Sequence, residues 1–485
     1  MTVTERFDLS APTVSLEDLG RVHVTNVGGA GMSAVARVLL GRGVAVSGSD
    51  PKDLPVLAAL REQGADVHAG AQPDTVDRAD TVVVSSATRE SDPELVRARQ
   101  LGTRVLHRSQ ALASAAEGRR VVAVAGANGK TTTTSMLTAL LLEAGADPSF
   151  AIGGELARYG TNARAGSGEA FVIEADESDG SFLVYHPEVA IVTNVQPDHL
   201  DHYGTFEAVQ DAYLAFARSI RPGGLLVACA DDEGSARLAR RAQAEGVRVL
   251  TYGTSATADV RVVGHVVDGF RTVARIVDEG QDRELSVAIP GAHNVLNATA
   301  AYAAAHHGLG VDASRAAAGL AAYTGTRRRF ELKGEAGGVT VVDDYAHNPG
   351  KVAAVVGTAA ALQERPHRLV VVFQPHLYSR TADFAQELGA ALLPADVVVV
   401  MDVYAAREDP VPGVTGELVA DAARRCAEAE PGPACEVHYE ASWDAVAPLV
   451  ASLVRPGDLV LTVGAGDVTA LGPQVLAILE GAAAS

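Results

Sequence analysis

Seven consecutive residues combine glycines, a lysine and two hydroxyl side chains. Gly126-Ala127-Asn128-Gly129-Lys130-Thr131-Thr132 follows the apolar stretch Val121–Ala125 and precedes a stretch with helical character. Backbone amides at a helix N-terminus attract phosphate, Lys130 would pair with β- and γ-phosphates, and Thr131 would hold Mg²⁺. The segment is not a complete Walker A motif, because Val124 stands where that motif has its first glycine. The alternative interpretation is a lysine-bearing helix start that binds nothing.

Two acidic clusters follow, and each comes after an apolar stretch. Glu174-Ala175-Asp176-Glu177-Ser178-Asp179 ends one stretch, and Asp198-His199-Leu200-Asp201-His202 comes after Thr193-Asn194 at the end of another. Carboxylates are ligands of Mg²⁺, which tolerates an imidazole, although the His/Asp spacing could also suggest Zn²⁺. No cysteine lies nearby and a candidate phosphate loop precedes both clusters, so the sequence favours Mg²⁺. Taken alone, either cluster could be a solvated acidic surface.

A second glycine-rich turn lies near the N-terminus. Val27-Gly28-Gly29-Ala30-Gly31-Met32-Ser33-Ala34 contains the pattern G-x-G-x-x-A after a predicted strand, and Asp50 follows 19 residues after Gly31. The glycines allow backbone amides to approach a diphosphate at a helix N-terminus. The pattern indicates a diphosphate but does not name the cofactor. NAD binding is therefore one interpretation, and a tight turn without a ligand is another.

Four patches in the second half of the chain could also bind ligands. They are Gly291-Ala292-His293-Asn294-Val295-Leu296-Asn297, Arg327-Arg328-Arg329-Phe330, Asp343-Asp344-Tyr345-Ala346-His347-Asn348-Pro349 and Gln374-Pro375-His376-Leu377-Tyr378-Ser379-Arg380. Asn294 and Asn297 lie three residues apart, so they share a helix face and could bind the edge of an adenine. The alternative is a helix cap at Asn294 with Asn297 there by chance. An arginine of the second patch could reach a phosphate across a domain boundary.

Composition narrows the class of protein. The chain has 485 residues, 47% of them hydrophobic and 21% charged, and a formal net charge of −20. These values are typical of a soluble globular protein of about three domains, and the acidic surface argues against nucleic acid and anionic membranes as partners. Met1–Leu19 has no signal-peptide pattern, and no apolar run reaches the roughly 18 residues of a membrane span. The three cysteines show no metal-ligand spacing, which indicates reduced thiols in the cytoplasm.

Apolar strands that alternate with helices must position these motifs. Such alternation indicates parallel sheets covered by helices on both faces, that is, an α/β fold. The first series is expected at Arg21–Val27, Met32–Arg42, Val44–Ser47, Pro55–Gln63, Thr81–Ser85, Pro93–Leu101 and Arg104–Leu106. The second is expected at Val121–Ala125, Phe171–Glu174 and Val189–Asn194, with a small β insertion at 259–289 and a helix at Asn294–His307. The third is expected at Thr340–Asp344, Leu369–Phe373, Val397–Val403 and Leu459–Val463.

The motifs, taken in this order along nearly the whole chain, resemble those of the Mur ligases. The resemblance implies three domains: a Rossmann-like UDP-sugar-binding domain (1–118), a central P-loop-type ATPase domain with a parallel sheet (119–332), and a Rossmann-like domain that binds the amino acid and closes the site (333–485). Within the family the pattern is most similar to members that join L-alanine to UDP-N-acetylmuramate, with ATP and Mg²⁺, in peptidoglycan precursor synthesis. A cytoplasmic monomer or weak homodimer is implied.

The resemblance also assigns residues of the nucleotide site. Lys130 and Thr131, with Gly126, Gly129 and Thr132, would bind ATP phosphates. Thr131, Glu174 and His199 would be metal ligands. Asn294 and Asn297 would contact adenine, Arg329 a phosphate, and Asp344 the ribose or phosphates. These assignments make Lys130 and His199 part of the catalytic machinery.

Other assignments concern the sugar and the amino acid. The first glycine turn would hold the UDP diphosphate through Gly29, Ala30, Gly31, Met32 and Ser33, with Asp50. Thr161-Asn162-Ala163-Arg164 is similar to a family loop near the sugar nucleotide, so Thr161 and Asn162 belong to the same predicted site. His347 and Arg380 would lie near the incoming amino acid and act in catalysis.

The chain departs from the usual family pattern at four positions. It has Ala127-Asn128 where members usually have Thr-His, Asn348 where a second histidine is usual, and Leu377 where many have arginine. Two alternatives stay open beside alanine addition. One is a ligase that joins a preformed peptide to the same sugar in wall recycling, and the other is an altered paralogue that only binds the sugar. An NAD-dependent dehydrogenase is a third, although it would leave Lys130 and the acidic clusters unexplained.

Overall fold

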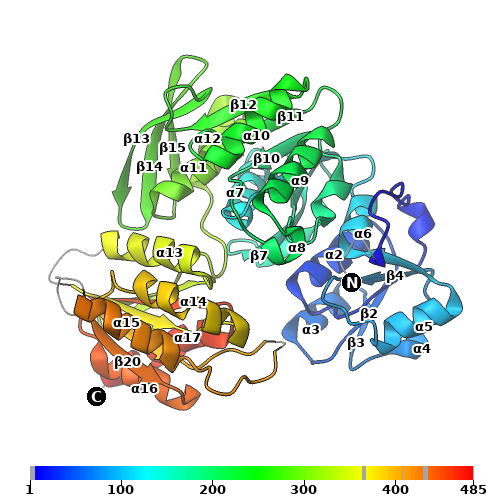
Figure 1. The fold of residues 1–485 in the computed structure, drawn as a ribbon. Helices are drawn as coiled ribbons and strands as arrows, with labels where there is room; N and C mark the ends of the chain where they lie inside the picture. Colours follow the sequence, from blue (N-terminus) through cyan, green and yellow to red (C-terminus); the bar gives the residue numbers. More distant parts are fainter. Residues whose placement is uncertain (1–5, 363–366, 407, 430–434, 484–485) are drawn as a thin grey trace. The chain divides into compact units, whose positions relative to one another are not determined.

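A computed structural model describes residues 6–362, 367–406, 408–429 and 435–483 (Figure 1). The chain forms two compact units, Met1–Thr324 and Gly325–Ser485. Each unit consists of parallel strands with helices packed against them, which confirms the expected α/β class. Among the described residues, no helix has both the length and the apolar composition that crossing a membrane requires.

The first sheet of unit 1 is entirely parallel, with the order β3-β2-β1-β4-β5. Its strands are β1 Val22–Val24, β2 Val46–Asp50, β3 Asp66–Ala69, β4 Thr81–Val84 and β5 Arg104–His107. Its helices are α2 Ala30–Gly41, α3 Pro55–Glu62, α4 Pro73–Val76, α5 Pro93–Leu101 and α6 Arg108–Ala115, after the short η1 Glu17–Leu19. Strand order reverses at β1, and open parallel sheets bind ligands at the carboxyl ends of strands beside such a reversal. The glycine turn after β1 lies at this position.

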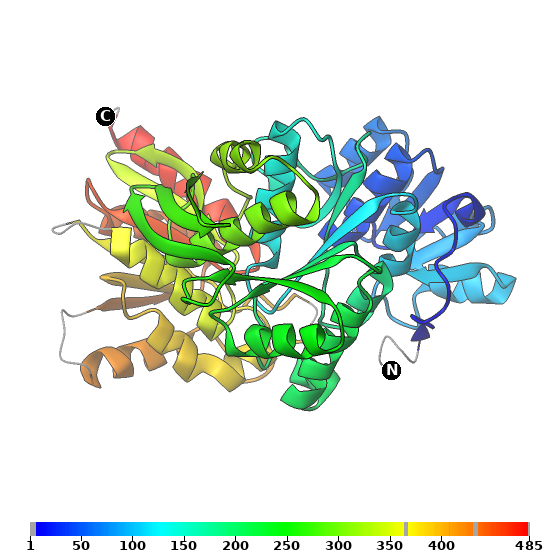
Figure 2. The same ribbon diagram turned by 90° about the horizontal axis from the view of Figure 1, so that it is seen from above.

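The second sheet of unit 1 has ten strands in the order β15-β14-β13-β12-β11-β10-β6-β9-β7-β8. The strands are β6 Arg120–Ala125, β7 Ser149–Leu156, β8 Thr161–Arg164, β9 Ala170–Glu174, β10 Val189–Val192, β11 Leu225–Cys229, β12 Arg248–Gly253, β13 Val260–Asp268, β14 Arg271–Asp278 and β15 Gln281–Val287. The helices are α7 Lys130–Glu143, η2 Ser181–Tyr185, α8 Leu200–Tyr203, α9 Phe206–Arg218, α10 Glu233–Ala244, α11 Ala292–Ala303, the π-turn η3 Ala304–Gly308 and α12 Ala313–Ala321. Strands β13–β15 pair antiparallel and form the predicted β insertion, green in Figures 1 and 2.

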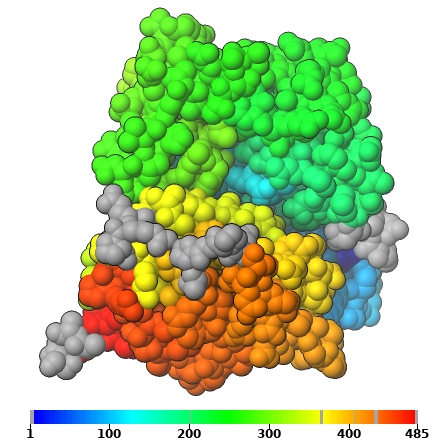
Figure 3. Space-filling view, turned by 60° about the vertical axis from the view of Figure 1, so that its left-hand side comes forward, coloured from blue at the N-terminus to red at the C-terminus, as the bar shows by residue number. Residues whose placement is uncertain are grey.

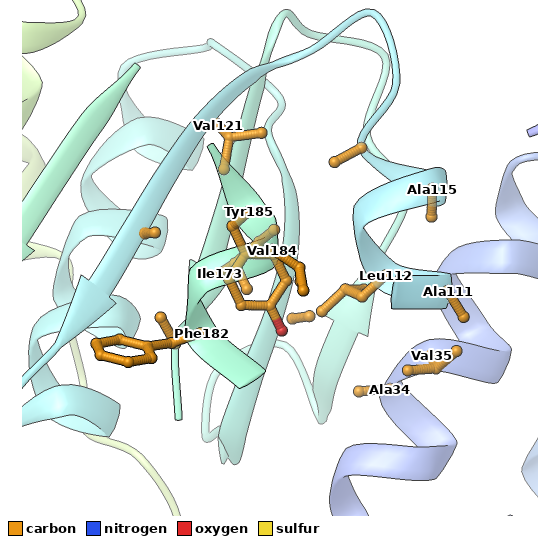
Figure 4. Packing of buried hydrophobic residues seen from close by; sticks show 14 of the residues in the cluster. Ala34, Val35, Ala111, Leu112, Ala115, Val121, Ile173, Phe182, Val184 and Tyr185 are labelled. Carbon is orange, nitrogen blue, oxygen red and sulfur yellow. The ribbon is translucent and has the colours of Figure 1, made fainter. Parts of the chain in front are cut away.

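One hydrophobic cluster runs through both sheets of unit 1. Figure 4 shows Ala34 and Val35 of α2 near α6, and Leu112 of α6 near Val184 and Tyr185 of η2. All five side chains belong to that cluster, and each is at most 7% exposed. Because close-packed side chains have few voids to move into, this shared core fixes the first sheet against the second. Residues near one glycine-rich loop can therefore contact residues near the other within the same compact unit.

Unit 2 contains a six-stranded sheet in the order β16-β17-β21-β18-β19-β20, with only β16 antiparallel. The strands are β16 Glu331–Ala336, β17 Val339–Asp344, β18 Leu369–Phe373, β19 Val397–Met401, β20 Glu436–Glu440 and β21 Leu459–Val463. The helices are α13 Pro349–Leu362, α14 Tyr378–Ala391, α15 Glu417–Ala429, α16 Trp443–Leu453, η4 Asp467–Ala470 and α17 Leu471–Ala483. Figure 3 shows one face of this unit in yellow, orange and red. The ends of its parallel strands bring the two downstream patches to one edge.

Three predicted elements differ from the structure by three residues or more at one end, and the other predicted bounds lie within two residues. Strand β1 ends at Val24, three residues early, because the chain turns at Asn26 in the left-handed region (φ 50°). Strand β2 lies later than expected and includes Asp50. The helix expected to continue to His307 changes to a π-turn after Ala303, a rare widening with no signal in hydrophobic periodicity.

Candidate functional site

The loop between β6 and α7 is closely surrounded by other backbone and side chains. Gly126 has φ 138° and Gly129 has φ 85°, a region that favours glycine. A Cβ on Gly126 would lie 2.0 Å from Thr193 Oγ1, and one on Gly129 would lie 2.6 Å from Asn297 Oδ1. Both glycines are therefore required for close approach, and the backbone amides at the start of α7 are presented as a phosphate-binding turn presents them.

Lys130 lies inside this turn and is held by two acceptors. Its Nζ donates to Gly126 O at 2.7 Å and to Glu177 Oε1 at 2.7 Å. The side chains of Lys130 and Glu177 are 16% and 3% exposed. Burial opposes the charge on the lysine, but Glu177, Asp176 and Glu174 outweigh it and raise the Lys130 pKa. The ammonium stays charged where a phosphate would lie, with a carboxylate as its present partner.

The predicted metal ligands lie next to the same turn. Thr131 Oγ1 donates to Glu174 Oε1 at 2.8 Å, and Glu174 Oε2 also accepts from Gly153 N at 2.7 Å. His199 has left-handed backbone (φ 54°), and its Nε2 lies 3.9 Å from Glu177 Oε1. Glu177 thus connects His199 to Lys130. The structure brings together Lys130, Thr131, Glu174 and His199 as expected, and adds Glu177, which the sequence placed in the cluster without a role.

Residues after β10 hold the turn in shape. Thr193 Oγ1 donates to Asn128 O at 2.6 Å, and Asn194 Oδ1 accepts from Asn128 N at 2.8 Å. The Asn128 side chain donates to Gln196 Oε1 at 3.1 Å. Asn128, one of the departures from the family pattern, is therefore tied to the adjacent strand end through both its backbone and its side chain.

Asn294 and Asn297 lie beneath the turn, at the start of α11. Asn297 Oδ1 accepts from Thr133 Oγ1 at 3.2 Å, and Asn297 Nδ2 donates to Asn294 Oδ1 at 3.1 Å. Asn294 Nδ2 donates to Pro290 O at 2.7 Å. The helix N-cap is Gly291, so the interpretation of Asn294 as a cap is wrong. Both amides are buried and bonded within the protein, and they brace the phosphate loop against α11.

The first glycine turn is organised by Asp50. Gly28 N donates to Asp50 Oδ2 at 3.0 Å, and Lys52 N donates to Asp50 Oδ1 at 3.0 Å. Helix α2 starts at Ala30 with Gly29 as its N-cap, and both residues are exposed. Met32 and Ser33 are buried in the first turn of the helix.

The loop at β8 meets this turn from the second sheet. Asn162 Nδ2 donates to Ala30 O at 2.9 Å. Arg37 Nη1 donates to Asn162 Oδ1 at 2.8 Å and to Thr161 Oγ1 at 3.4 Å. The two segments predicted to bind one sugar nucleotide are therefore adjacent. Arg37 was not predicted, because the contact spans 125 residues of sequence and no local pattern indicates it.

Arg108 lies between the first glycine turn and the acidic cluster after β9. Its Nη2 donates to Asp176 Oδ2 at 2.8 Å, and its Nη1 would lie 3.2 Å from a Cβ on Gly31. Asp176 is half-buried, and the loss of solvent would favour the neutral acid, but Arg108 and Lys130 lower the Asp176 pKa well below its usual value. Beside this pair, Ser86 donates to Asp179, and His107 Nε2 lies 3.1 Å from Ser86 Oγ. Arg108 is thus a second unpredicted cation, positioned between the first glycine turn and the acidic cluster after β9.

In unit 2, Arg328, Asp343 and Asp344 gather at the ends of β17 and β21. Arg328 Nη2 donates to Gly464 O at 2.6 Å, and Asp343 accepts from Thr462 and Thr469 at 2.6 and 2.7 Å. Asp344 accepts from Phe330 N and Ala346 N at 2.8 Å each. Burial raises the Asp344 pKa even though Arg329 opposes this effect. Asp344 therefore fixes the backbone just before β16 and just after β17. A ligand that contacts this carboxylate would have to share it with these two amides.

An aromatic row continues along this edge. The rings of Tyr345 and His347 lie 5.3 Å apart, those of His347 and His376 5.7 Å, and those of His376 and Tyr404 5.9 Å. Arg380 Nη1 lies 3.3 Å from His376 Nδ1. Burial lowers the pKa of His347 to about 3, so this imidazole is neutral near pH 7. The structure brings the two predicted patches of unit 2 together.

The departures Leu377 and Asn348 have structural roles in unit 2. Leu377 is buried at 9% exposure, has φ 70° and forms the N-cap of α14. Asn348 Oδ1 accepts from Lys351 N at 2.9 Å at the start of α13.

The fold and these contacts define a class: a nucleotide-binding α/β protein with a phosphate loop beside a carboxylate cluster and a diphosphate-type turn in the adjoining sheet. Comparison with known families agrees. Residues 21–120 match the Mur ligase family, catalytic domain, residues 124–305 match the Mur ligase middle domain, and residues 328–466 match the Mur ligase, glutamate ligase domain. The chain belongs to the Mur ligase family.

Individual relatives match over almost their full length. The UDP-N-acetylmuramate–L-alanine ligase of Kineococcus radiotolerans is 56% identical over 97% of this chain and 99% of the relative. The ligase of the same name from Saccharopolyspora erythraea is 54% identical over 95% of this chain and 94% of the relative. Among solved structures, the UDP-N-acetylmuramate-alanine ligase from Thermotoga maritima has a TM-score of 0.79 at 27% identity, covering 95% of this chain and 99% of that one.

Proposed function

We propose that this protein is an ATP-dependent ligase that joins L-alanine to UDP-N-acetylmuramate through an acyl-phosphate intermediate, giving ADP and phosphate, in peptidoglycan precursor synthesis. The substrates come from the relatives, which carry that name at 56% and 54% identity. The observation that carries the chemistry is the phosphate loop, in which Lys130 and Thr131 each contact a carboxylate of the following cluster.

The chemistry needs an activated carboxylate, because oxide is too poor a leaving group for direct attack by an amine. The muramyl carboxylate attacks the γ-phosphorus, ADP leaves, and an acyl phosphate forms. The alanine amine then attacks the acyl carbon, and the tetrahedral intermediate collapses to amide and phosphate. No protein nucleophile takes part, so the protein contributes positioning and charge stabilisation. Lys130 supplies the fixed positive charge at the β- and γ-phosphates.

The carboxylate cluster fits a hard divalent cation. Glu177 Oε2 is buried with no hydrogen-bond partner among the described residues. Thr131 and Glu174, which share a hydrogen bond, offer a hydroxyl and a carboxylate oxygen, and His199, which lies near Glu177, offers an imidazole nitrogen. We propose Thr131, Glu174 and His199 as the residues that hold Mg²⁺. Bound there, Mg²⁺ would offset phosphate charge that otherwise keeps two anions apart.

The proposed sugar site combines the α2 turn with the β8 loop. Gly29, Ala30 and Gly31 present backbone to the UDP diphosphate, Asp50 fixes the turn, and Thr161 with Asn162 closes it from the second sheet. Met32 and Ser33 contribute as the buried first turn of the helix. Arg37, which contacts Thr161 and Asn162, and Arg108, which lies beside Gly31, would add positive charge to this site.

Six further residues have proposed roles in binding ATP and L-alanine. Arg329 would bind a phosphate, and Asp344 would contact the ATP ribose or phosphates. Asn294 and Asn297 would reach adenine by exchanging their present partners. Neutral His347 could hold or deprotonate the amine, with Arg380 near the alanine carboxylate.

We propose the division 1–118, 119–332 and 333–485 for sugar, ATP and amino-acid domains. The place of action would be the cytoplasm, as a monomer or weak homodimer.

An omission assay tests the proposal. Phosphate release is measured with UDP-N-acetylmuramate, ATP, Mg²⁺ and L-alanine together and with each left out in turn. We expect release only from the complete mixture. A parallel arm replaces L-alanine by a tripeptide, and faster release there would identify a recycling ligase instead. No release in either arm would identify a paralogue that binds without turnover.

A further inference from the structure

A second group of metal-ligating side chains lies in unit 1, outside the nucleotide and sugar sites. Asp278 at the end of β14 meets His306 and His307 of the π-turn η3, and one possible ligand atom from each lies within 4.8 Å of the others. His307 Nε2 is 2.9 Å from Asp278 Oδ1, and His306 Nε2 is 3.9 Å from Asp278 Oδ2. None of these residues has a role in the ligase reaction proposed above.

The π-turn explains how neighbouring histidines reach one carboxylate. Consecutive residues of an α-helix point in different directions, so two adjacent side chains do not normally share a partner. The wider turn at 304–308 reduces that separation, and the two imidazole rings lie 4.6 Å apart. Such local widenings are rare and often occur at functional sites.

The hydrogen bonds fix the direction of the His306 lone pair. His306 Nδ1 lies 2.8 Å from Val311 O, and because a carbonyl only accepts, Nδ1 must carry the proton. In the neutral ring Nε2 is then an acceptor, yet it faces Asp278 Oδ2, another acceptor. A cation between the two atoms would satisfy both. A histidine bonded to a carbonyl through its other nitrogen is the usual arrangement of a metal ligand.

We propose that Asp278, His306 and His307 bind a divalent transition-metal ion of the Zn²⁺ type, with water as a fourth ligand. Ligands at about 2.0–2.2 Å in a tetrahedron lie roughly 3.4 Å from each other. The observed 2.9 and 3.9 Å separations bracket that value, so small side-chain shifts suffice. Binding replaces the hydrogen bond between His307 and Asp278, and His307 binds as the neutral imidazole that carries its proton on Nδ1 and presents the Nε2 lone pair to the ion. Tyr302 OH, which donates to Asp278 Oδ2 at 2.7 Å, orients the carboxylate from behind.

The proposed metal site is open to solvent, and it lies near the opposite end of β6 from the phosphate loop. His306, His307 and Asp278 are 23%, 11% and 2% exposed, so the imidazoles reach solvent and the carboxylate does not. The carbonyls of Gly308 and Leu309 accept from Arg120, the first residue of β6, whereas the phosphate loop follows the last residue of β6. The ion would therefore join the end of α11 to β14 as a structural element and not take part in catalysis.

Zinc binding by the full-length protein tests the proposal. Zn²⁺ is titrated against a metallochromic indicator with Mg²⁺ in large excess, which occupies carboxylate sites that prefer hard cations. We expect the wild-type chain to bind one equivalent of Zn²⁺. The affinity for this equivalent should fall at least about 10-fold in Asp278→Asn and in the double variant His306→Gln/His307→Gln. The matched control is His265→Gln, an exposed histidine on β13, which should keep that equivalent.

A zinc-edge X-ray absorption spectrum of the wild-type protein gives a readout that needs no variant. We expect two imidazoles with oxygen ligands and no sulfur, and a Zn²⁺-dependent rise in unfolding temperature that both cluster variants lose. Sulfur ligands, equal stoichiometry in wild type and the double variant, or an equal loss in His265→Gln would each overturn the proposal. These readouts do not depend on turnover, so they stand apart from the ligase assignment.

Discussion

Replacing Lys130 by methionine separates the stability of the phosphate loop from its chemistry. The lysine and Glu177 form a buried pair at 2.7 Å, with side chains 16% and 3% exposed. Removing one partner of a buried pair costs about 3–5 kcal/mol, because the other charge is left uncompensated. We therefore expect Lys130→Met to lose about that much free energy of unfolding near pH 8. Turnover should fall at least about 10²-fold, since a fixed charge at the phosphates is gone.

The double variant Lys130→Met/Glu177→Gln distinguishes the two effects. Without the carboxylate there is no uncompensated charge, so most of the lost stability should return, while turnover should not. Urea unfolding followed by circular dichroism measures the first quantity and phosphate release the second. Lys52→Met, which removes an exposed lysine, should change stability by no more than about 0.5 kcal/mol.

The deficit of Lys130→Met also has a predicted pH dependence. Burial raises the Glu177 pKa even with Lys130 present, and loss of the lysine removes the main opposing effect. An acid whose folded pKa lies above its unfolded value destabilises the fold as pH rises through the folded pKa. The deficit should therefore be smaller at pH 5.5 than at pH 8. A deficit that does not change with pH, or a double variant as unstable as the single one, would refute the pairing argument, and near-normal turnover in Lys130→Met would refute the phosphate-loop assignment.

Three further predictions follow from other contacts. Gly129→Ala should lose more stability and more ATP affinity than Gly145→Ala, as measured by urea unfolding and equilibrium dialysis. Both glycines have positive φ, which costs an alanine about 1 kcal/mol of strain. The new methyl group would lie 2.6 Å from Asn297 Oδ1 at position 129, whereas nothing lies within 4 Å of it at position 145. Asn162→Ala should raise KM for UDP-N-acetylmuramate about 10-fold and leave KM for ATP unchanged in initial-rate assays, because Arg37 loses its charge-assisted acceptor. The His347 pKa is about 6.5 in the unfolded chain and about 3 in the folded one, so unit 2 should lose stability as the pH falls below 6.5. The loss of stability should be smaller in His347→Gln, and the fluorescence of Trp443 during unfolding measures it.

Local signals predicted those parts of the fold that local interactions decide. The helix at Pro93–Leu101 was predicted with its observed bounds: Asp92 accepts from two amides of the first turn, and Gly102 ends the helix with φ 68°. Strands Leu369–Phe373 and Leu459–Val463 were also predicted with their observed bounds, because continuous apolar runs mark strands buried on both faces. The phosphate loop and both acidic clusters were found because parallel strands bring their carboxyl ends to one edge.

The contacts that complete the site depend on distant pairs and had no local signal. Arg108 meets Asp176 across 68 residues, and Arg37 meets Asn162 across 125. Which acid of the cluster pairs with Lys130 also depends on how β9 and β6 align, since four carboxylates lie within six residues. At Asn294 a local signal misled the prediction. Asparagine favours helix caps, but the cap of α11 is Gly291 and Asn294 lies inside the first turn.

In a chain with a net charge of −20, two cations of the proposed site, Lys130 and Arg108, are already paired with carboxylates. Lys130 bonds to Glu177, and Arg108 bonds to Asp176, so neither charge attracts phosphate at long range. Binding a nucleotide then exchanges one anionic partner of Lys130 for another, and its affinity is the difference between the two pairings. It follows that Glu177→Gln, with Lys130 kept, should bind ATP more tightly in the absence of divalent cation, as measured by equilibrium dialysis, because the competing carboxylate is gone. Unchanged or weaker binding would mean that Glu177 positions the lysine and does not compete for it.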